Sequence, residues 1–85
     1  MAMTKLTKLG NVVVGDRFVW RTAEIMGEAV KGTTFEGQTL TVLGFMPASY
    51  VSRVVLRTEN AAEILLRLDV VERGLRLYPV QARAQ

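Results

Sequence analysis

The sequence contains no cysteine and no histidine. Without cysteine, the chain has neither disulfides nor thiolate metal sites. Without histidine, it lacks the commonest general base, the commonest zinc ligand and every Ser-His-Asp or Cys-His catalytic arrangement. The acidic residues show no convergent pair that points to acid–base chemistry. We therefore expect a protein that is not an enzyme and that holds no metal and no cofactor.

Aromatic residues are few, at 7% of the chain, and long hydrophobic runs are missing. Grooves that bind proline-rich peptides are lined with several aromatics, so the sequence does not support that function. No stretch approaches the ~18 apolar residues of a membrane span. The first nine residues lack the apolar stretch of a signal peptide. We expect a cytoplasmic protein that makes no contact with a membrane.

Apolar residues are abundant: they make up 49% of the 85 residues, against 22% charged residues. This balance predicts a folded core rather than disorder, and the length predicts one domain. The net charge of +3 comes from eleven basic and eight acidic residues, which are interleaved along the chain. We expect an N-terminal arm over residues 1–11, the folded domain over residues 12–80 and a polar tail over residues 81–85.

The folded part is dense in Val, Leu, Ile and Thr, which favour strands. The first strand signal runs from Val12 to Arg21, with a turn or bulge at Gly15-Asp16. Within it Phe18 and Trp20 share one face, which we expect to lie in the core. Alternation of apolar and polar residues predicts further strands over residues 38–45, 51–58, 62–68 and 75–78.

Two segments between these strands are less regular. Residues 22–37 are ambiguous: residues 22–30 fit either a short helix with Thr22 as its N-cap or an irregular hairpin around Gly27, and a loop follows up to Gly37. Residues 69–74 fit a one-turn helix, because Gly74 suits the position after a helix end. Tyr50 follows Pro47 in a loop, where we expect an exposed aromatic.

The strands over residues 51–58 and 62–68 form a hairpin whose register follows from their apolar faces. The faces coincide only if Leu56 pairs with Ile64 and Val54 with Leu66, because a one-residue slip turns one apolar set outward. The loop is then Glu59-Asn60-Ala61, with its second or third residue close to the left-handed conformation. On the outer face this register pairs Arg57 with Glu63, Val55 with Leu65, and Arg53 with Arg67.

This outer face is the candidate functional surface. Val55 and Leu65 make an apolar pair on a face expected in solvent, and the two arginines beside them are like charges across a pair, which is unfavourable. The long first loop or the N-terminal arm covers the pair, or the face is an interface, or the two guanidinium groups form an anion site. We expect an interface with a second copy, as a homo-oligomer, or with another protein. Its residues are Arg53, Val55, Arg57, Glu63, Leu65 and Arg67.

The order and spacing of these segments over residues 12–80 resemble those of SH3-like barrels. The resemblance implies an all-β, five-stranded barrel with a long first loop and a one-turn helix before the last strand. Within that class, Gly15-Asp16-Arg17, Gly37-Gln38 and Tyr78-Pro79-Val80 resemble the type II dihydrofolate reductases carried by plasmids and integrons. That resemblance implies an origin in a mobile element or phage. In that family a Val-Gln-Ile-Tyr segment lines the active pore, and here Arg76 replaces its glutamine.

We therefore expect a non-enzymatic binding module that acts by self-association or by docking on another protein. The alternative is an SH3-like domain that binds nucleic acid through its basic residues, because Lys and Arg contacts to phosphate dominate such binding. A reductase-like pore enzyme is a third and weaker reading. The basic residues of the alternative are Lys5, Lys8, Arg53, Arg57, Arg67 and Arg76.

Overall fold

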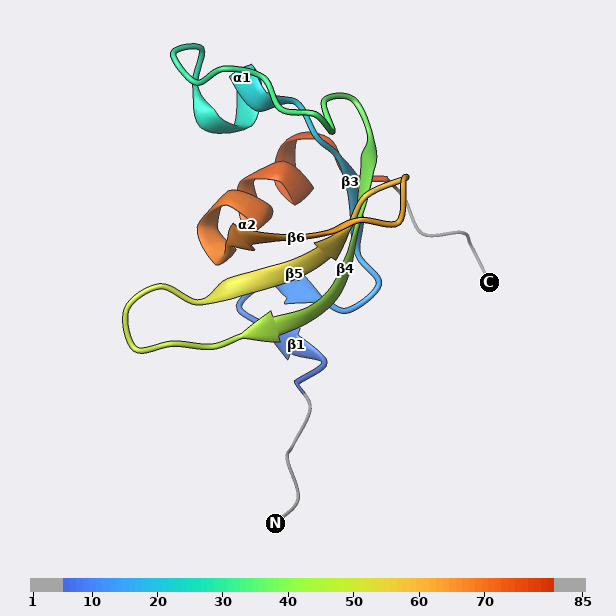
Figure 1. Ribbon diagram of the computed structural model, residues 1–85. Coiled ribbons are helices and arrows are strands. Elements are labelled where there is room, and N and C mark those ends of the chain that lie inside the picture. Colours follow the sequence, from blue (N-terminus) through green and yellow to red (C-terminus); the bar gives the residue numbers. More distant parts are fainter. Residues whose placement is uncertain (1–5, 81–85) are drawn as a thin grey trace.

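The computed structural model describes residues 6–80 of the chain. Strands dominate this range, and the two helices are short (Figure 1). The predicted polar tail and Lys5 lie outside the described residues. The elements in chain order are β1 (Lys8–Leu9), β2 (Val12–Val13), β3 (Arg17–Val19), α1 (Thr22–Met26), β4 (Thr39–Met46), β5 (Arg53–Arg57), β6 (Glu63–Arg67) and α2 (Leu68–Leu77).

The strands form two antiparallel sheets, which confirms the prediction of a small, mostly β protein. β1 and β2 pair in a two-stranded sheet inside the predicted arm and at the start of the predicted domain. The other strands form one sheet in the order β3-β4-β5-β6. Over residues 6–80 this sheet does not close on itself, so β3 and β6 are its two edge strands.

The core lies between the four-stranded sheet and α2, which lies across one face of the sheet (Figure 1). Phe18 and Trp20 are buried, as the strand pattern predicted. Burial of large apolar side chains on one sheet face and one helix stripe is the main source of stability in a domain of this size. The buried apolar residues are Val12, Phe18, Trp20, Ile25, Leu40, Val42, Val54, Leu56 and Val71.

The prediction of a final strand over residues 75–78 is wrong, because Leu75 to Leu77 form the last turn of α2. The apolar residues Leu68, Val71 and Leu75 recur at the spacing of one helix face. Gly74 does not end the helix. It is buried against the ring of Phe18, at a point where the helix approaches the sheet too closely for a side chain.

After α2 the chain returns to the free edge of β3. The carbonyl of Tyr78 accepts a hydrogen bond from the Val19 N–H at 3.0 Å, and the Val80 N–H donates to the carbonyl of Arg17 at 2.9 Å. Pro79 lies opposite Phe18 in this bridge. The edge of β3 is therefore covered by residues 78–80.

The long segment over residues 22–37 forms α1 and a loop that closes back on the start of β4. Arg21 occupies the N-cap position of α1, so the N-cap role considered for Thr22 is wrong. Thr22 is buried, and its hydroxyl accepts a hydrogen bond from the Trp20 indole N–H at 2.7 Å and donates one to the Glu36 carboxylate. The ring of Phe35 packs 5.3 Å from that of Trp20. The hydroxyl therefore ties both ends of the loop to the core.

Acid should weaken this closure of the loop. The hydrogen bond from the Thr22 hydroxyl, aided by backbone N–H groups and the nearby Arg21 charge, lowers the pKa of Glu36 below its ordinary value of 4.5 against a smaller opposing effect of burial. A carboxylate with a lowered pKa in the folded state adds stability above its unfolded pKa, and that stability is lost as the pH falls through the folded pKa. In urea titrations, we expect the stability advantage of the wild type over Glu36→Gln to be constant near neutral pH. This stability advantage should shrink once the pH falls below 4.5. An advantage that persists at about pH 2, where carboxyl groups are protonated, would contradict this role for the carboxylate.

None of the helices between residues 6 and 80 has the length and apolar character that crossing a bilayer requires.

Candidate functional site

The hairpin of β5 and β6 has the register that its apolar faces predicted. Leu56 lies opposite Ile64 and Val54 opposite Leu66, while the three outer pairs are those expected from the sequence. The left-handed residue of the loop is Ala61, with φ of 66°. Val54 and Leu56 are fully buried, so the assignment of inner and outer faces is confirmed.

The outer face continues onto β4, which the residue pattern did not predict. A bulge shifts the register of β4 between Val42 and Gly44, so that Leu43 is the extra residue. Gly44 and Met46 therefore stand on the same face as Thr41, although simple alternation separates them. We call this face of β4, β5 and β6 the outer patch. Its three rows are Thr41, Arg57 and Glu63; Gly44, Val55 and Leu65; and Met46, Arg53 and Arg67.

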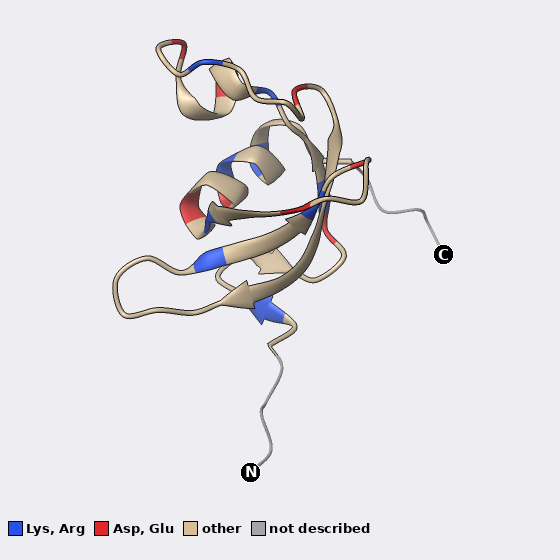
Figure 2. Cartoon of the chain, viewed as in Figure 1, with Lys and Arg blue, Asp and Glu red and all other residues tan. Residues whose placement is uncertain are grey.

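Charge lies at the ends of the outer patch and apolar surface lies along its middle. Figure 2 shows basic residues at both ends of β5 and an acidic residue at the start of β6. Within the patch the acidic residue is Glu63, and the basic ones are Arg53, Arg57 and Arg67. An anionic group on a partner would therefore meet a basic patch with a single acidic position.

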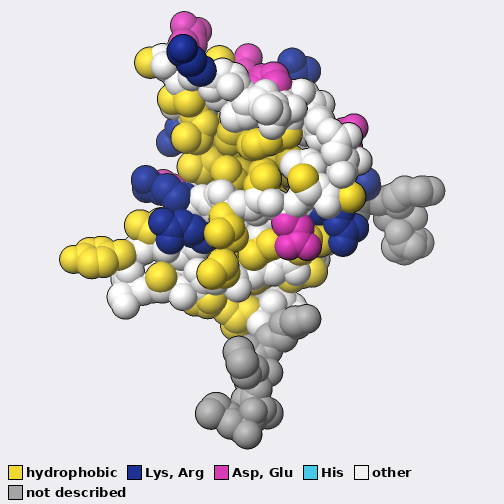
Figure 3. Space-filling view, viewed as in Figure 1, with side chains coloured by type: hydrophobic (Ala, Val, Ile, Leu, Met, Phe, Trp, Pro, Cys, Tyr) yellow, Lys and Arg dark blue, Asp and Glu magenta, His cyan; other side chains and the backbone are white. Residues whose placement is uncertain are grey.

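Two apolar side chains of the patch are open to solvent, Leu65 in the middle row and Met46 in an end row. Leu65 is 48% exposed and Met46 is 52% exposed, while Val55 is half-buried. Above Gly44 there is empty space where a side chain would stand. Figure 3 shows hydrophobic side chains over β5 and β6 between groups of basic side chains. Since Leu65 and Met46 keep about half of their surface exposed, the long loop does not cover them.

An acidic residue of the same chain reduces the repulsion between Arg53 and Arg67. The guanidinium of Arg67 donates two hydrogen bonds to the carboxylate of Asp69, at 3.1 and 2.9 Å. Between residues 6 and 80 this is the only ion pair. Both side chains are largely exposed, so the pair contributes at most about 1 kcal/mol. Asp69 belongs to the first turn of α2, and the sequence pattern gave no reason to pair it with Arg67.

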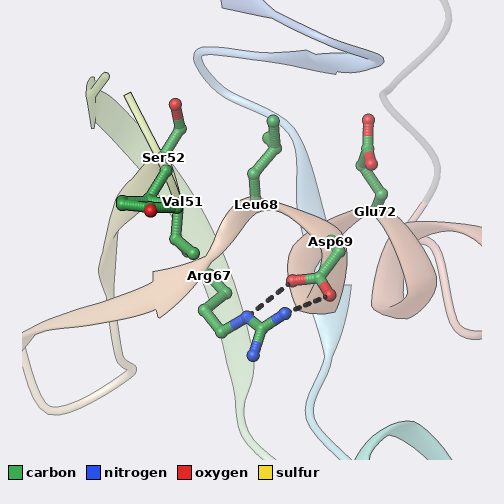
Figure 4. Close-up of a pocket in the computed structure, with 7 residues that line it drawn as sticks. Val51, Ser52, Arg67, Leu68, Asp69 and Glu72 are labelled. Carbon is green, nitrogen blue, oxygen red and sulfur yellow. Dashed lines mark hydrogen bonds and ion pairs between the residues drawn. The ribbon is translucent and has the colours of Figure 1, made fainter. Parts of the chain in front are cut away.

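An open pocket of about 360 Å³ lies beside the patch, between the loop that follows β4 and the start of α2. Arg67 and Asp69 form one side of it, and Leu68 and Glu72 project from the same helix start (Figure 4). The Glu72 carboxylate accepts a hydrogen bond from the Asn11 N–H at 3.1 Å, which holds the β1–β2 turn to α2. Tyr50 is fully exposed at its rim, as expected for its loop.

Contacts within the chain engage most polar side chains of the pocket. Its carboxylates already serve the ion pair with Arg67 and the turn at Asn11. Over the described residues, no group of three acidic, histidine or cysteine side chains could hold a metal ion. The Ser52 hydroxyl accepts a hydrogen bond from the Ala48 N–H at 3.2 Å and so shapes the loop.

The basic residues proposed for nucleic acid do not share one surface. Arg53, Arg57 and Arg67 lie on the outer patch. Arg76 lies on α2, which packs against the opposite face of the sheet, and Lys8 lies on β1 in the other sheet.

Comparison with known proteins gave no match to any protein-family model, curated protein or solved structure.

Proposed function

We propose that this chain is a non-enzymatic binding module that acts through its outer patch, by self-association or by docking on another protein. The exposed apolar row between rows of charge is the observation that carries the proposal. A single exposed Leu needs no explanation. Val55 and Leu65 lie opposite each other on β5 and β6, and Met46 lies one row further along on β4. Apolar surface rimmed by charge is typical of protein interfaces.

Self-association is the simpler form of the proposal. A two-fold contact uses one patch twice, so the three arginines and Glu63 of one copy can meet those of another. Charged residues at the rim orient such a contact, while the apolar row supplies the buried area. Asp69 already neutralises Arg67 in part, so a partner need not match every arginine.

We further propose that the fold is a variant of the SH3-like barrel. The support is the order of pairing: residues 78–80 bridge the edge of β3 that β4 leaves free. A last extended segment beside the first strand of the sheet is what that barrel requires. The proposed variant differs in having a ten-residue helix, α2, where a single turn was expected.

The first test replaces Leu65 by Lys. A charge in the apolar row should weaken self-association at least about tenfold, or about 1.4 kcal/mol, and leave the fold intact. The matched control is Leu77→Lys on α2, because Leu77 is 44% exposed against 48% for Leu65. Sedimentation equilibrium should show a dissociated Leu65→Lys variant and an unchanged control. A strictly monomeric wild type at the highest soluble concentration would exclude self-association and leave only a foreign protein.

Nucleic acid is the alternative partner, and we expect weak or no binding. The charge excess is small, and the basic residues are divided between separate surfaces. Each phosphate contact releases counterions, so true binding would weaken steeply as salt rises. Fluorescence anisotropy with labelled DNA and RNA at low and high salt measures this. Tight binding with a steep salt dependence would favour the alternative over the protein interface.

A further inference from the structure

β6 is an edge strand whose outward backbone groups can be identified. The Thr58 N–H donates to the carbonyl of Ala62 at 2.8 Å, and the Leu68 N–H donates to the carbonyl of Ser52 at 3.0 Å. In an antiparallel pair, hydrogen-bonded and non-hydrogen-bonded positions alternate. The even-numbered residues of β6 therefore bond to β5. The outward N–H groups belong to Glu63, Leu65 and Arg67.

These outward N–H groups have no acceptor in the described part of the chain. An edge with unpaired N–H groups is a template for a further strand. The side chains of the same residues stand on the outer patch, so an added strand would extend the patch as well as the sheet. On the inner side, Ile64 and Leu66 are only partly buried, so an added strand would also cover apolar surface beside the edge.

The sequence of β6 is complementary to itself when it is reversed. The strand reads Glu63-Ile64-Leu65-Leu66-Arg67, with an acidic residue at one end, a basic residue at the other and apolar residues between. An antiparallel copy centred on Leu65 places Glu63 opposite Arg67 of the second copy, and Arg67 opposite its Glu63. Opposite charges directly across a strand pair are stabilising.

Backbone phase and charge select the same register. Because the outward groups are on odd-numbered residues, an added copy of β6 must also present odd-numbered residues. Pairing Glu63 with Glu63 or Arg67 with Arg67 sets like charges together. Shifting the centre to Ile64 or Leu66 pairs one charged residue with Leu65. Only the register centred on Leu65 satisfies both the backbone and the charges.

We propose that a second copy of this chain binds at the free edge of β6, in a two-fold antiparallel pairing centred on Leu65. The inference rests on the proposed self-association and changes its geometry: the sheets of two copies join side by side rather than face to face, so that of the apolar row only Leu65 lies at the contact. The Leu65 residues exchange backbone hydrogen bonds, and Ile64 of each copy lies across from Leu66 of the other. The Arg67 N–H donates to the carbonyl of Glu63 of the second copy.

The decisive experiment uses charge exchange across the two-fold axis. In Glu63→Arg the pairing sets arginine against arginine twice, and in Arg67→Glu it sets glutamate against glutamate twice. Each variant alone should dimerise at least about tenfold more weakly than the wild type. A one-to-one mixture of the two restores both opposite-charge pairs and should form a heterodimer at near wild-type strength. The double variant, which exchanges both charges in one chain, should again form a homodimer.

A second measurement, on the wild type, does not depend on how the variants fold. Amide hydrogen exchange followed by NMR should show slower exchange at Leu65 and Arg67 as the protein concentration rises. The Ile64 amide is the internal control, because it already bonds to β5 and should not change. Equal behaviour of odd and even amides would overturn the edge geometry.

The outcomes separate this inference from the proposed function. If Leu65→Lys dissociates the protein but the mixture of charge variants shows no recovery, the outer patch associates in another geometry and the edge pairing is wrong. If the wild type stays monomeric at every concentration, edge pairing and self-association both fail, and docking on a foreign protein is what remains of the proposed function. Recovery in the mixture, together with protection of the odd amides, would establish the pairing.

Discussion

Replacing Leu56 by alanine should lower the free energy of unfolding by about 2–5 kcal/mol. Leu56 has no exposed surface, and it pairs with Val42 on one side and Ile64 on the other. The substitution removes buried apolar contacts and leaves a cavity that the sheet cannot fill by a small shift. A domain of 85 residues has a modest total stability, of about 5–15 kcal/mol, so urea denaturation should show a large change in midpoint.

The matched control for this prediction is the neighbouring residue on the outer face. Arg57→Ala should cost less than about 1 kcal/mol, because Arg57 is exposed and exposed charge pairs contribute little. The two residues are neighbours on β5 and occupy opposite faces of the sheet. Equal costs would contradict the assignment of inner and outer faces on which the outer patch depends.

Replacing Gly74 by alanine should destabilise the protein by about 1–3 kcal/mol through overpacking. The direction is informative, because in an exposed helix interior the same change stabilises by about 1 kcal/mol. Here the new Cβ would lie 2.5 Å from Cδ2 of Phe18 and closer still to Cε2, well inside van der Waals contact. Phe18 is fully buried, so its ring has little room to move aside.

Gly44→Ala is the matched control for Gly74. Gly44 lies in β4 with open space where the Cβ would stand, and its φ is not in the left-handed region. Alanine there should leave stability unchanged or raise it by up to about 1 kcal/mol, since it restricts the unfolded chain. Thermal unfolding of both variants measures the contrast. If Gly74→Ala proved as stable as the wild type, α2 would not approach the sheet as closely as described.

Residue patterns of period two predicted the hairpin of β5 and β6 well. Both of its strands have a clear apolar face, so a single register satisfies Leu56 with Ile64 and Val54 with Leu66. The same register predicted a left-handed residue at Asn60 or Ala61, and the structure has it at Ala61. The burial of Phe18 and Trp20 followed from the same alternation on β3.

The pattern misled at α2, where two signals were ambiguous. Leu75-Arg76-Leu77 alternates like a strand, but over so short a segment the same residues also fit a helix. Gly74 reads as a helix stop from sequence, whereas it is the point where the helix touches Phe18. From sequence alone, a glycine that lets a helix pack closely against its neighbour cannot be distinguished from a glycine that ends a helix.

Two features of the candidate site could not be predicted from the sequence. The bulge in β4 places Gly44 and Met46 on the outer patch, and the local sequence does not mark an inserted residue at Leu43. The ion pair of Arg67 with Asp69 depends on where α2 begins. The pattern predicted that the strand continues through Leu68. In the structure α2 begins at Leu68, and Asp69 lies in its first turn.

The return of residues 78–80 to β3 gives the sheet two unlike sides. One side already has its neighbour and the other, at β6, does not. Such a sheet can accept one added strand, at β6, because residues 78–80 already cover the edge of β3. If two copies pair through β6 as proposed, the joined sheet has no further open edge among residues 6–80 of either copy, and growth stops at the dimer. In the proposed pairing, residues 78–80 would limit the assembly to two copies.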